Sequence, residues 1–311
     1  MPTEPLTVAA IQMHSEPLQL ERNLIHAEAL VEQAVRQGAR LVLLPELMPG
    51  GYRLTEEIQR TARPFGGAVT EWLTGLARRL DIHLGTTFLE KAGADYYNAF
   101  ALATPSGRIA GRVRKSPPAS VEAYFYRAGD DAHYIDTDLG RIGVGICYEN
   151  LLHERLLGLH HAGVDLVLQP SAAGRPLPFL PGDVARFERM LRDSTPYYAR
   201  ALGVPVAMAN QAGPLCTPLP GGLPKIASSF PGLSAIVDSD GTVKARLGEA
   251  EGVIVADVRL DPSRKVTAPP PRFGRRWAVP VPWYAFIWPL TQKMGERHYA
   301  AASRKASDTA A

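Results

Sequence analysis

The chain has 311 residues, of which 46% are hydrophobic and 21% are charged, and its formal net charge is +3. This composition excludes a generally disordered chain, which would combine low hydrophobicity with high net charge. The small net charge gives no support for a nucleic-acid partner. No apolar run is long enough to span a membrane. The first residues do not resemble a signal peptide, and two cysteines cannot build a disulfide framework, so we expect a cytoplasmic protein.

Short apolar stretches alternate with amphipathic ones from the N-terminus onward. Residues 6–13 are apolar and partly β-branched, which predicts a buried strand. Residues 18–37 place apolar side chains at intervals of three and four and end at Gly38, which predicts a helix with one buried face. Residues 41–44 predict a second buried strand. A strand–helix–strand opening is typical of sheets that are covered by helices.

The same alternation continues along the chain. Helices are expected at residues 68–80, 151–162 and 184–202. Strands are expected at residues 82–88, 97–103, 108–114, 141–146, 164–169, 204–209, 233–237, 243–246 and 252–258. This pattern predicts an α/β fold.

The composition changes near residue 264. Residues 264–311 hold nine Lys or Arg and two acidic residues, and they include an aromatic cluster at Trp277, Trp283, Tyr284, Phe286 and Trp288. Dense aromatic side chains of this kind are typical of contact surfaces. We therefore predict one domain over residues 1–263 and a basic, aromatic C-terminal tail that docks on its own body or on a partner subunit.

Three ionisable side chains each follow a predicted strand, where catalytic groups of layered α/β proteins tend to lie. They are Glu46, Lys115 and Cys147. Each of these residues also has a structural interpretation when it is considered alone. Cys147 could be a thiol packed in the core, Glu46 could cap a turn, and Lys115 could lie in a solvated loop. Considered together, they could form a catalytic set. Cys147 would be the nucleophile, Glu46 the general base that removes its proton, and Lys115 the cation that stabilises a developing oxyanion.

These segments resemble the nitrilase superfamily of carbon–nitrogen hydrolases. The resemblance is carried by Leu-Leu-Pro-Glu at residues 43–46, by Arg-Lys with a proline at residues 114–118, and by Gly-Val-Gly-Ile-Cys-Tyr-Glu at residues 143–149. It implies an α/β fold of the four-layer αββα sandwich type. It also implies that the Cys147 thiol attacks the substrate and forms a thioester, with Glu46 as general base. Lys115 and the backbone N–H of Tyr148 would face the oxyanion, and Glu122 would hold Lys115 in place.

The resemblance also implies a substrate pocket and a mode of assembly. The implied pocket residues are Tyr52, Tyr148, Glu149, Ser171 and Arg175, of which Arg175 could bind a substrate carboxylate. The expected partners are a small-molecule amide or nitrile and further copies of the same chain, in a homodimer or a larger homo-oligomer. No metal ion or organic cofactor is expected.

The substrate class stays open at the level of sequence. Asn150 after Glu149 resembles the Cys-Trp-Glu-Asn pattern of nitrilases, but Tyr148 replaces the tryptophan. His153 and Glu154 stand where nitrilases usually carry Pro-Leu. We therefore expect hydrolysis of an amide or a nitrile. The alternatives are N-carbamoyl amide hydrolysis, acyl transfer to an amine by the same residues, and a catalytically silent scaffold.

Overall fold

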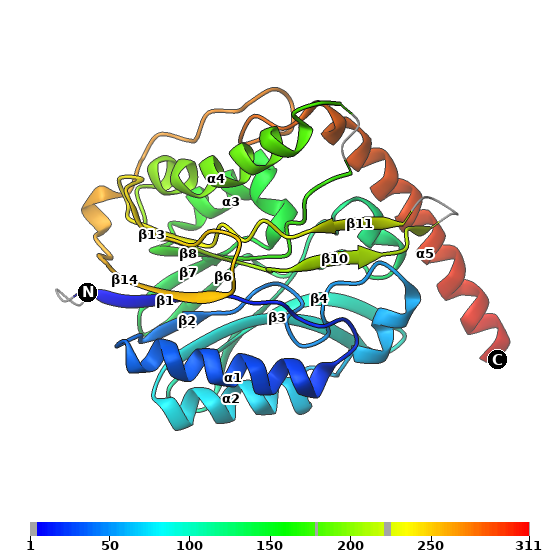
Figure 1. Cartoon of the computed structure of the whole chain (residues 1–311), viewed down its shortest axis with the longest axis horizontal. Coiled ribbons are helices and arrows are strands. Elements are labelled where there is room, and N and C mark those ends of the chain that lie inside the picture. The colour runs from blue at the N-terminus through cyan, green and yellow to red at the C-terminus, as the bar shows by residue number, and fades with distance from the viewer. Residues whose placement is uncertain (1–4, 178–179, 221–224, 311) are drawn as a thin grey trace.

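Two six-stranded sheets pack face to face at the centre of the structure, and helices cover both outer faces (Figure 1). The computed structural model describes residues 5–177, 180–220 and 225–310. The two sheets have the strand orders β14-β1-β2-β3-β4-β5 and β13-β12-β9-β8-β7-β6. This arrangement is the predicted αββα sandwich.

The first sheet is built mainly from the N-terminal part of the chain. Its strands are β1 (Leu6–Gln12), β2 (Leu41–Leu43), β3 (His83–Ala92), β4 (Asp95–Ala103), β5 (Ile109–Arg114) and β14 (Gly252–Val258). Strands β1, β2 and β3 run parallel, whereas β14, β4 and β5 pair with antiparallel neighbours. The helices α1 (Leu20–Arg36) and α2 (Ala68–Leu80) cover its outer face.

The second sheet is built from the following part of the chain. Its strands are β6 (Tyr134–Thr137), β7 (Gly140–Val144), β8 (Leu166–Ser171), β9 (Val206–Asn210), β12 (Ala235–Val237) and β13 (Val243–Arg246). Strands β7, β8 and β9 are parallel to one another. The helices α3 (His153–Ala162) and α4 (Asp183–Leu202) cover its outer face.

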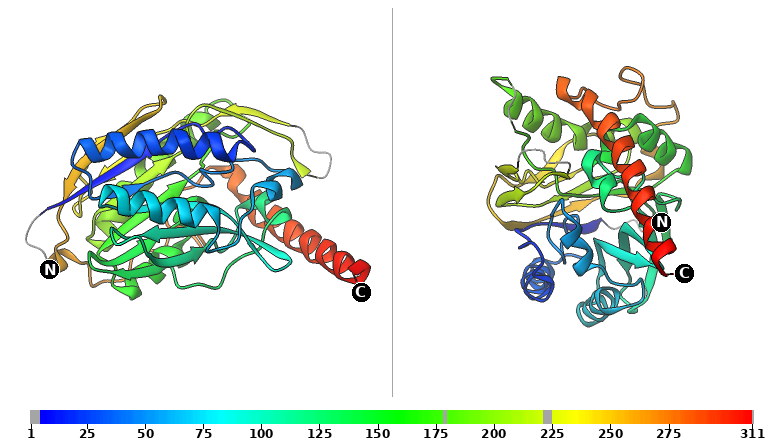
Figure 2. Two further views of the ribbon diagram at one scale, coloured as in Figure 1. Left: turned by 90° about the horizontal axis from the view of Figure 1, so that it is seen from below. Right: turned by 90° about the vertical axis from the view of Figure 1, so that its right-hand side faces the viewer.

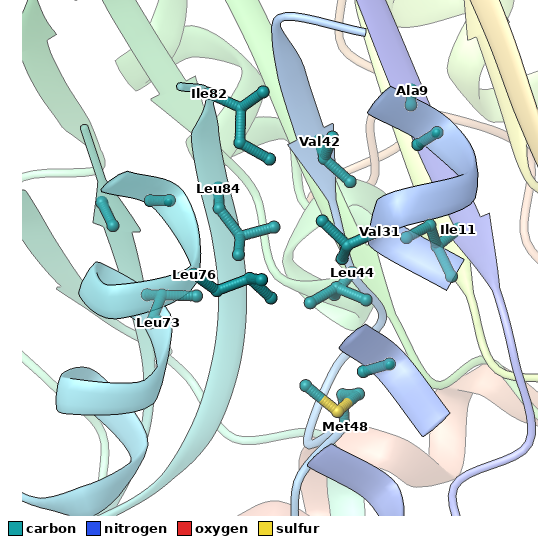
Figure 3. Packing of buried hydrophobic residues seen from close by; sticks show 14 of the residues in the cluster. Ala9, Ile11, Val31, Val42, Leu44, Met48, Leu73, Leu76, Ile82 and Leu84 are labelled. Carbon is teal, nitrogen blue, oxygen red and sulfur yellow. The ribbon is translucent and has the colours of Figure 1, made fainter. Parts of the chain in front are cut away.

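Strand β1 shows how the sequence separates the layers. Val8 and Ala10 are fully buried in the core between the two sheets, whereas Ala9 and Ile11 are fully buried under the helices. Successive side chains of a strand point to opposite faces, so a strand buried on both faces is apolar at every position. Figure 3 shows the helix-facing core, in which Val31 of α1 lies close to Leu44 and Leu76 of α2 lies near Leu84.

Two parts of the chain after residue 130 contain strands that the sequence did not predict. Strand β6 lies at the edge of the second sheet, and β10 (Pro214–Thr217) pairs with β11 (Ile226–Ser229) in a separate hairpin. Their sequences are Tyr-Ile-Asp-Thr, Pro-Leu-Cys-Thr and Ile-Ala-Ser-Ser, which contain too few apolar residues to form a clear apolar run.

The C-terminal tail folds back onto the body. Its Trp277 forms a β-bridge with Leu152, and the short helix η6 (Trp283–Ile287) leads into α5 (Trp288–Ala310). Helix α5 packs against η2 (Ser120–Tyr124), and its C-terminal end projects from the molecule (Figure 2). Within the described residues, no helix combines the length and apolar character needed to cross a membrane.

Candidate active site

The ends of three strands from the two sheets meet at one place. Glu46 follows β2 and Lys115 follows β5 in the first sheet. Cys147 follows β7 in the second sheet and begins the short helix η3 (Cys147–Leu151). Because the sheets are stacked face to face, residues that are far apart in sequence are brought into contact. The structure therefore brings together the three side chains that the sequence singled out.

Lys115 is fully buried between two carboxylates. Its Nζ donates hydrogen bonds of 2.7 Å to Glu46 Oε1 and of 2.7 Å to Glu122 Oε2. Burial alone would lower the pKa of Lys115, but the charges of Glu122 and Glu46 more than offset this effect and raise the pKa above its usual value. The ammonium group has three protons, so one remains for a further acceptor after these two contacts.

Glu46 is held by donors on both of its oxygens. Asn98 Nδ2 donates to Oε1 at 2.7 Å, and the backbone N–H of Ala172 donates to Oε2 at 2.9 Å. Burial raises the pKa of Glu46, while the Lys115 ammonium opposes that rise. The result is an oriented carboxylate that is more basic than an exposed one.

The Cys147 thiol lies within hydrogen-bonding reach of the Glu46 carboxylate and of the Ala172 amide. Burial, followed by the negative charge of Glu46, raises the pKa of the thiol well above its usual value. The sulfur is therefore a neutral thiol at rest, and Glu46 is positioned to take its proton.

The backbone around Cys147 adopts a tight turn. Cys147 has a φ of +51°, a left-handed conformation that is uncommon for residues other than glycine. The Asn150 side chain supports the turn, because its Nδ2 donates to the carbonyls of Gly145 at 2.7 Å and of Cys147 at 3.1 Å. A Cβ atom on Gly145 would lie 2.0 Å from Asn150 Oδ1, so the glycine is needed for this close approach.

Glu122 takes the place that the resemblance implied for it. Its Oε2 accepts from Lys115 and, at 2.7 Å, from the backbone N–H of Ala119. Its Oε1 accepts from the Tyr52 hydroxyl at 2.7 Å. Glu122 therefore fixes the position of the ammonium group and connects it to a tyrosine on the wall of the adjoining cavity.

A cavity of about 230 Å³ opens beside Cys147. Of the residues expected to form the pocket, Tyr52, Tyr148, Ser171 and Arg175 line it. Each nitrogen of the Arg175 guanidinium donates a hydrogen bond to another side chain. The guanidinium donates to Glu188 at 2.6 Å, to Ser229 Oγ at 2.6 Å and to Glu249 at 2.5 Å.

Glu149 does not line this cavity, which corrects the expectation that it contacts the substrate. Its carboxylate is fully buried and accepts from the backbone N–H groups of Ser116 and Ile146, both at 2.6 Å. His133 and Arg155 also contact it. Although burial opposes the effect, His133 and Arg155 lower the pKa of Glu149. Glu149 therefore ties the turns that carry Lys115 and Cys147 to each other.

The sequence did not single out most of the apolar wall of the cavity. It comprises Phe187, Met190 and Leu191 of α4, Leu215 and Ile226 of the β10–β11 hairpin, and Trp288 at the start of α5. The periodicity of α4 identifies a buried face but not what that face covers. The crowded aromatic tail was the available signal for Trp288, whose ring centroid lies 5.8 Å from that of Tyr148. Across the described residues, no group of three or more His, Cys, Asp or Glu side chains is placed to hold a metal ion.

The sequence of the chain is similar to that of a known protein family. The family model for carbon–nitrogen hydrolase matches residues 7–267. The chain is 30% identical over 268 residues to the N-carbamoylputrescine amidase of Solanum lycopersicum, covering 82% of this chain and 87% of that protein. It is 30% identical over 287 residues to the deaminated glutathione amidase of Bos taurus, covering 86% and 81%.

The fold also matches solved structures. The carbon–nitrogen hydrolase of Helicobacter pylori G27 superimposes with a TM-score of 0.75 at 22% identity, over 83% of this chain and 90% of that one. At this identity the similarity concerns the fold. The family model covers most of the chain, and the chain therefore belongs to the carbon–nitrogen hydrolase family.

Proposed function

We propose that the protein hydrolyses a small carboxamide to a carboxylic acid and ammonia through a thioester on Cys147. The observation that carries the proposal is the contact network of Lys115, which joins Glu46 and Glu122 beside the Cys147 thiol. A buried nucleophile, an oriented base and a fixed cation are the groups that acyl transfer from an amide requires.

In the first step Glu46 removes the proton from Cys147 while the sulfur attacks the amide carbon. The negative charge that develops on the amide oxygen faces the third proton of Lys115 and the backbone N–H of Tyr148. The tetrahedral intermediate then collapses, and the C–N bond breaks. Glu46 gives its proton to the nitrogen, so that ammonia leaves and a thioester remains.

In the second step water resolves the thioester. Glu46, again a carboxylate, takes a proton from water as the oxygen attacks the acyl carbon. The C–S bond breaks, and the proton returns to the sulfur as the carboxylic acid is released. The raised pKa of Glu46 suits both roles, because it accepts and returns a proton in each step.

The two relatives described above are both called amidases, which supports an amide substrate. A protein of Pyrococcus abyssi that is called a nitrilase is 33% identical over 53% of this chain, so a nitrile stays a further candidate. One of these relatives is called an N-carbamoylputrescine amidase, so hydrolysis of an N-carbamoyl compound is a second candidate function. Transfer of the acyl group to an amine uses the same thioester and differs only in the second step.

The test compares Cys147→Ala with Cys216→Ala, because Cys216 is an exposed cysteine on the separate hairpin. Ammonia release from a panel of amides, nitriles and N-carbamoyl compounds is expected from the wild type and from Cys216→Ala only. Intact mass spectrometry during turnover should show an acyl adduct that Cys147→Ala lacks. Equal ammonia release from Cys147→Ala would refute the assignment of the nucleophile.

We also propose that the chain assembles as a homodimer or larger homo-oligomer, with the C-terminal tail in the contact. Large apolar side chains of the tail are exposed, namely Phe286 (75%), Leu290 (62%) and Met294 (51%). Sedimentation velocity should show a species larger than one chain, and Leu290→Lys should shift it toward the monomer. An unchanged distribution would exclude the tail from the contact.

A further inference from the structure

The walls of the cavity beside Cys147 are mainly apolar. Helix α4 contributes Phe187, Met190 and Leu191, the β10–β11 hairpin contributes Leu215, and α5 contributes Trp288. All of these side chains line the same cavity as Cys147. An apolar wall of this kind favours hydrocarbon groups through removal of apolar surface from water.

Several polar side chains in the wall are already paired with protein partners, whereas the buried Tyr148 hydroxyl has no hydrogen-bond partner among the described residues. Asn150 Oδ1 accepts from Gln169 Nε2 at 3.1 Å, and Gln169 Oε1 accepts from Thr195 Oγ1 at 3.1 Å. Ser194 Oγ donates to the carbonyl of Leu191 at 3.0 Å. At Asn150, Gln169 and Ser194, a polar end group on a substrate would therefore compete with hydrogen bonds that the protein has already made.

The charge in the wall is also neutralised. Arg175 is the one Lys, Arg, Asp or Glu side chain among the described residues that line the cavity. Its guanidinium forms ion pairs with Glu188 and Glu249. A charged end group on a substrate would be buried without a counter-ion, which is strongly unfavourable.

We propose that the preferred substrates are amides whose acyl group is uncharged and apolar, of about six to ten carbon atoms. This inference rests on the proposed amide hydrolysis and adds the substrate class. The size follows from the cavity volume of about 230 Å³, because a cavity of about 150 Å³ holds one benzene ring. This proposal of an uncharged acyl group replaces the expectation that Arg175 binds a substrate carboxylate.

The first test uses three amides that share a six-carbon chain and differ at its far end. These are hexanamide, the monoamide of adipic acid, and 6-aminohexanamide, which end in a methyl, a carboxylate and an ammonium group. We expect kcat/KM for hexanamide to exceed that for each charged amide by about 100-fold. Charged amides that are turned over as well as hexanamide, or better, would overturn the proposal.

The second test removes the two carboxylates that neutralise the charge of Arg175. In Glu188→Gln/Glu249→Gln the guanidinium loses both counter-ions but keeps its side-chain length. We expect the ratio of kcat/KM for the adipic monoamide to that for hexanamide to rise about tenfold. The control is Glu28→Gln/Glu32→Gln, which removes the two carboxylates that pair with Arg79 on the outer helices and should leave the ratio unchanged.

A binding measurement separates this proposal from the proposed reaction. Calorimetry with Cys147→Ala should give tighter binding of hexanamide than of either charged amide. If the wild type turns over none of the amides but this order of binding holds, the proposed hydrolysis fails and the apolar specificity stands. If turnover occurs but a charged amide binds more tightly, the apolar specificity fails.

Discussion

Lys115 is a buried cation whose charge is balanced on both sides. Glu46 and Glu122 each accept a hydrogen bond of 2.7 Å from it, so the three groups act as one electrostatic unit. Removal of any one of these three buried side chains leaves an uncompensated charge. The protonation of Glu46 therefore depends on Lys115 as well as on burial.

This dependence predicts a change in the pH profile. The acid limb of kcat/KM reports the loss of a proton from Glu46, and we expect it above the ordinary glutamate value of 4.5. Lys115 lowers the pKa of Glu46, so Lys115→Gln should move the limb to higher pH and reduce the maximum rate. The exposed Lys91→Gln serves as control and should leave the profile unchanged. A limb that moves to lower pH in Lys115→Gln would contradict the assignment.

A second prediction concerns the contribution of Glu149 to the stability of the folded protein. Its carboxylate contacts His133 and compensates the charge of Arg155, so Glu149→Gln should lower the free energy of unfolding by about 3–5 kcal/mol at neutral pH. The pKa of Glu149 is lowered in the folded state, so its contribution is present above pH 4.5 and is lost as the pH falls through the folded value.

Urea unfolding at pH 7 and at pH 4 measures this effect. The difference between the wild type and Glu149→Gln should be smaller at pH 4. A difference that grows on acidification would show that the carboxylate is not stabilised by its buried partners.

At the scale of elements, α5 supports the site from outside the sandwich. It packs against η2, the short helix that carries Glu122, and Ser120 Oγ lies 2.7 Å from Thr291 Oγ1. At Gly295 an added Cβ atom would lie 2.7 Å from the Tyr124 ring, so the glycine allows this approach. The C-terminal helix therefore helps to position Glu122 and, through Trp288, closes one side of the cavity.

This role can be tested with two aromatic residues that lie close together in the tail. Trp288 forms edge-to-face contacts with Tyr148, Trp277 and Tyr284, whereas Phe286 is 75% exposed. Trp288→Ala should raise KM for an apolar amide about tenfold and lower Tm, because each aromatic contact contributes about 0.5–1.5 kcal/mol. Phe286→Ala should change neither value for the isolated chain. Equal effects of the two substitutions would rule out a specific role for Trp288.

At the scale of the whole molecule, the site exists because two sheets stack. Glu46 and Lys115 leave the first sheet and Cys147 leaves the second, so their distances depend on the core between the sheets. That core includes Leu43 and Phe100 on one side and Leu168 on the other, all fully buried. Any change in sheet separation moves the nucleophile relative to its base.

Leu168→Ala tests this coupling. The cavity that it leaves should lower the free energy of unfolding by about 2–5 kcal/mol. It should also lower kcat, because the sheet that carries Cys147 can shift toward the space. Ile25→Ala, at a side chain that is 71% exposed on α1, should change stability by less than about 0.5 kcal/mol. Urea unfolding and amide turnover, measured on the same preparations, show whether the losses occur together.

The sequence by itself determined the layered α/β fold and the candidate catalytic residues. Apolar patterns mark strands and helices over stretches of four to twenty residues, and Glu46, Lys115 and Cys147 each follow such a strand. The motifs around them carry the family resemblance, which the family model confirms. These features are local in the chain, so they can be recognised before the chain is folded.

Only the tertiary structure decided which side chains surround the nucleophile. The cavity wall combines α4, the β10–β11 hairpin and α5, which are widely separated in the chain. The same long-range packing places Glu188 and Glu249 on Arg175, and it buries Glu149 among its donors away from the cavity. Burial and charge pairing depend on contacts between distant segments, and no local pattern in the sequence encodes such contacts.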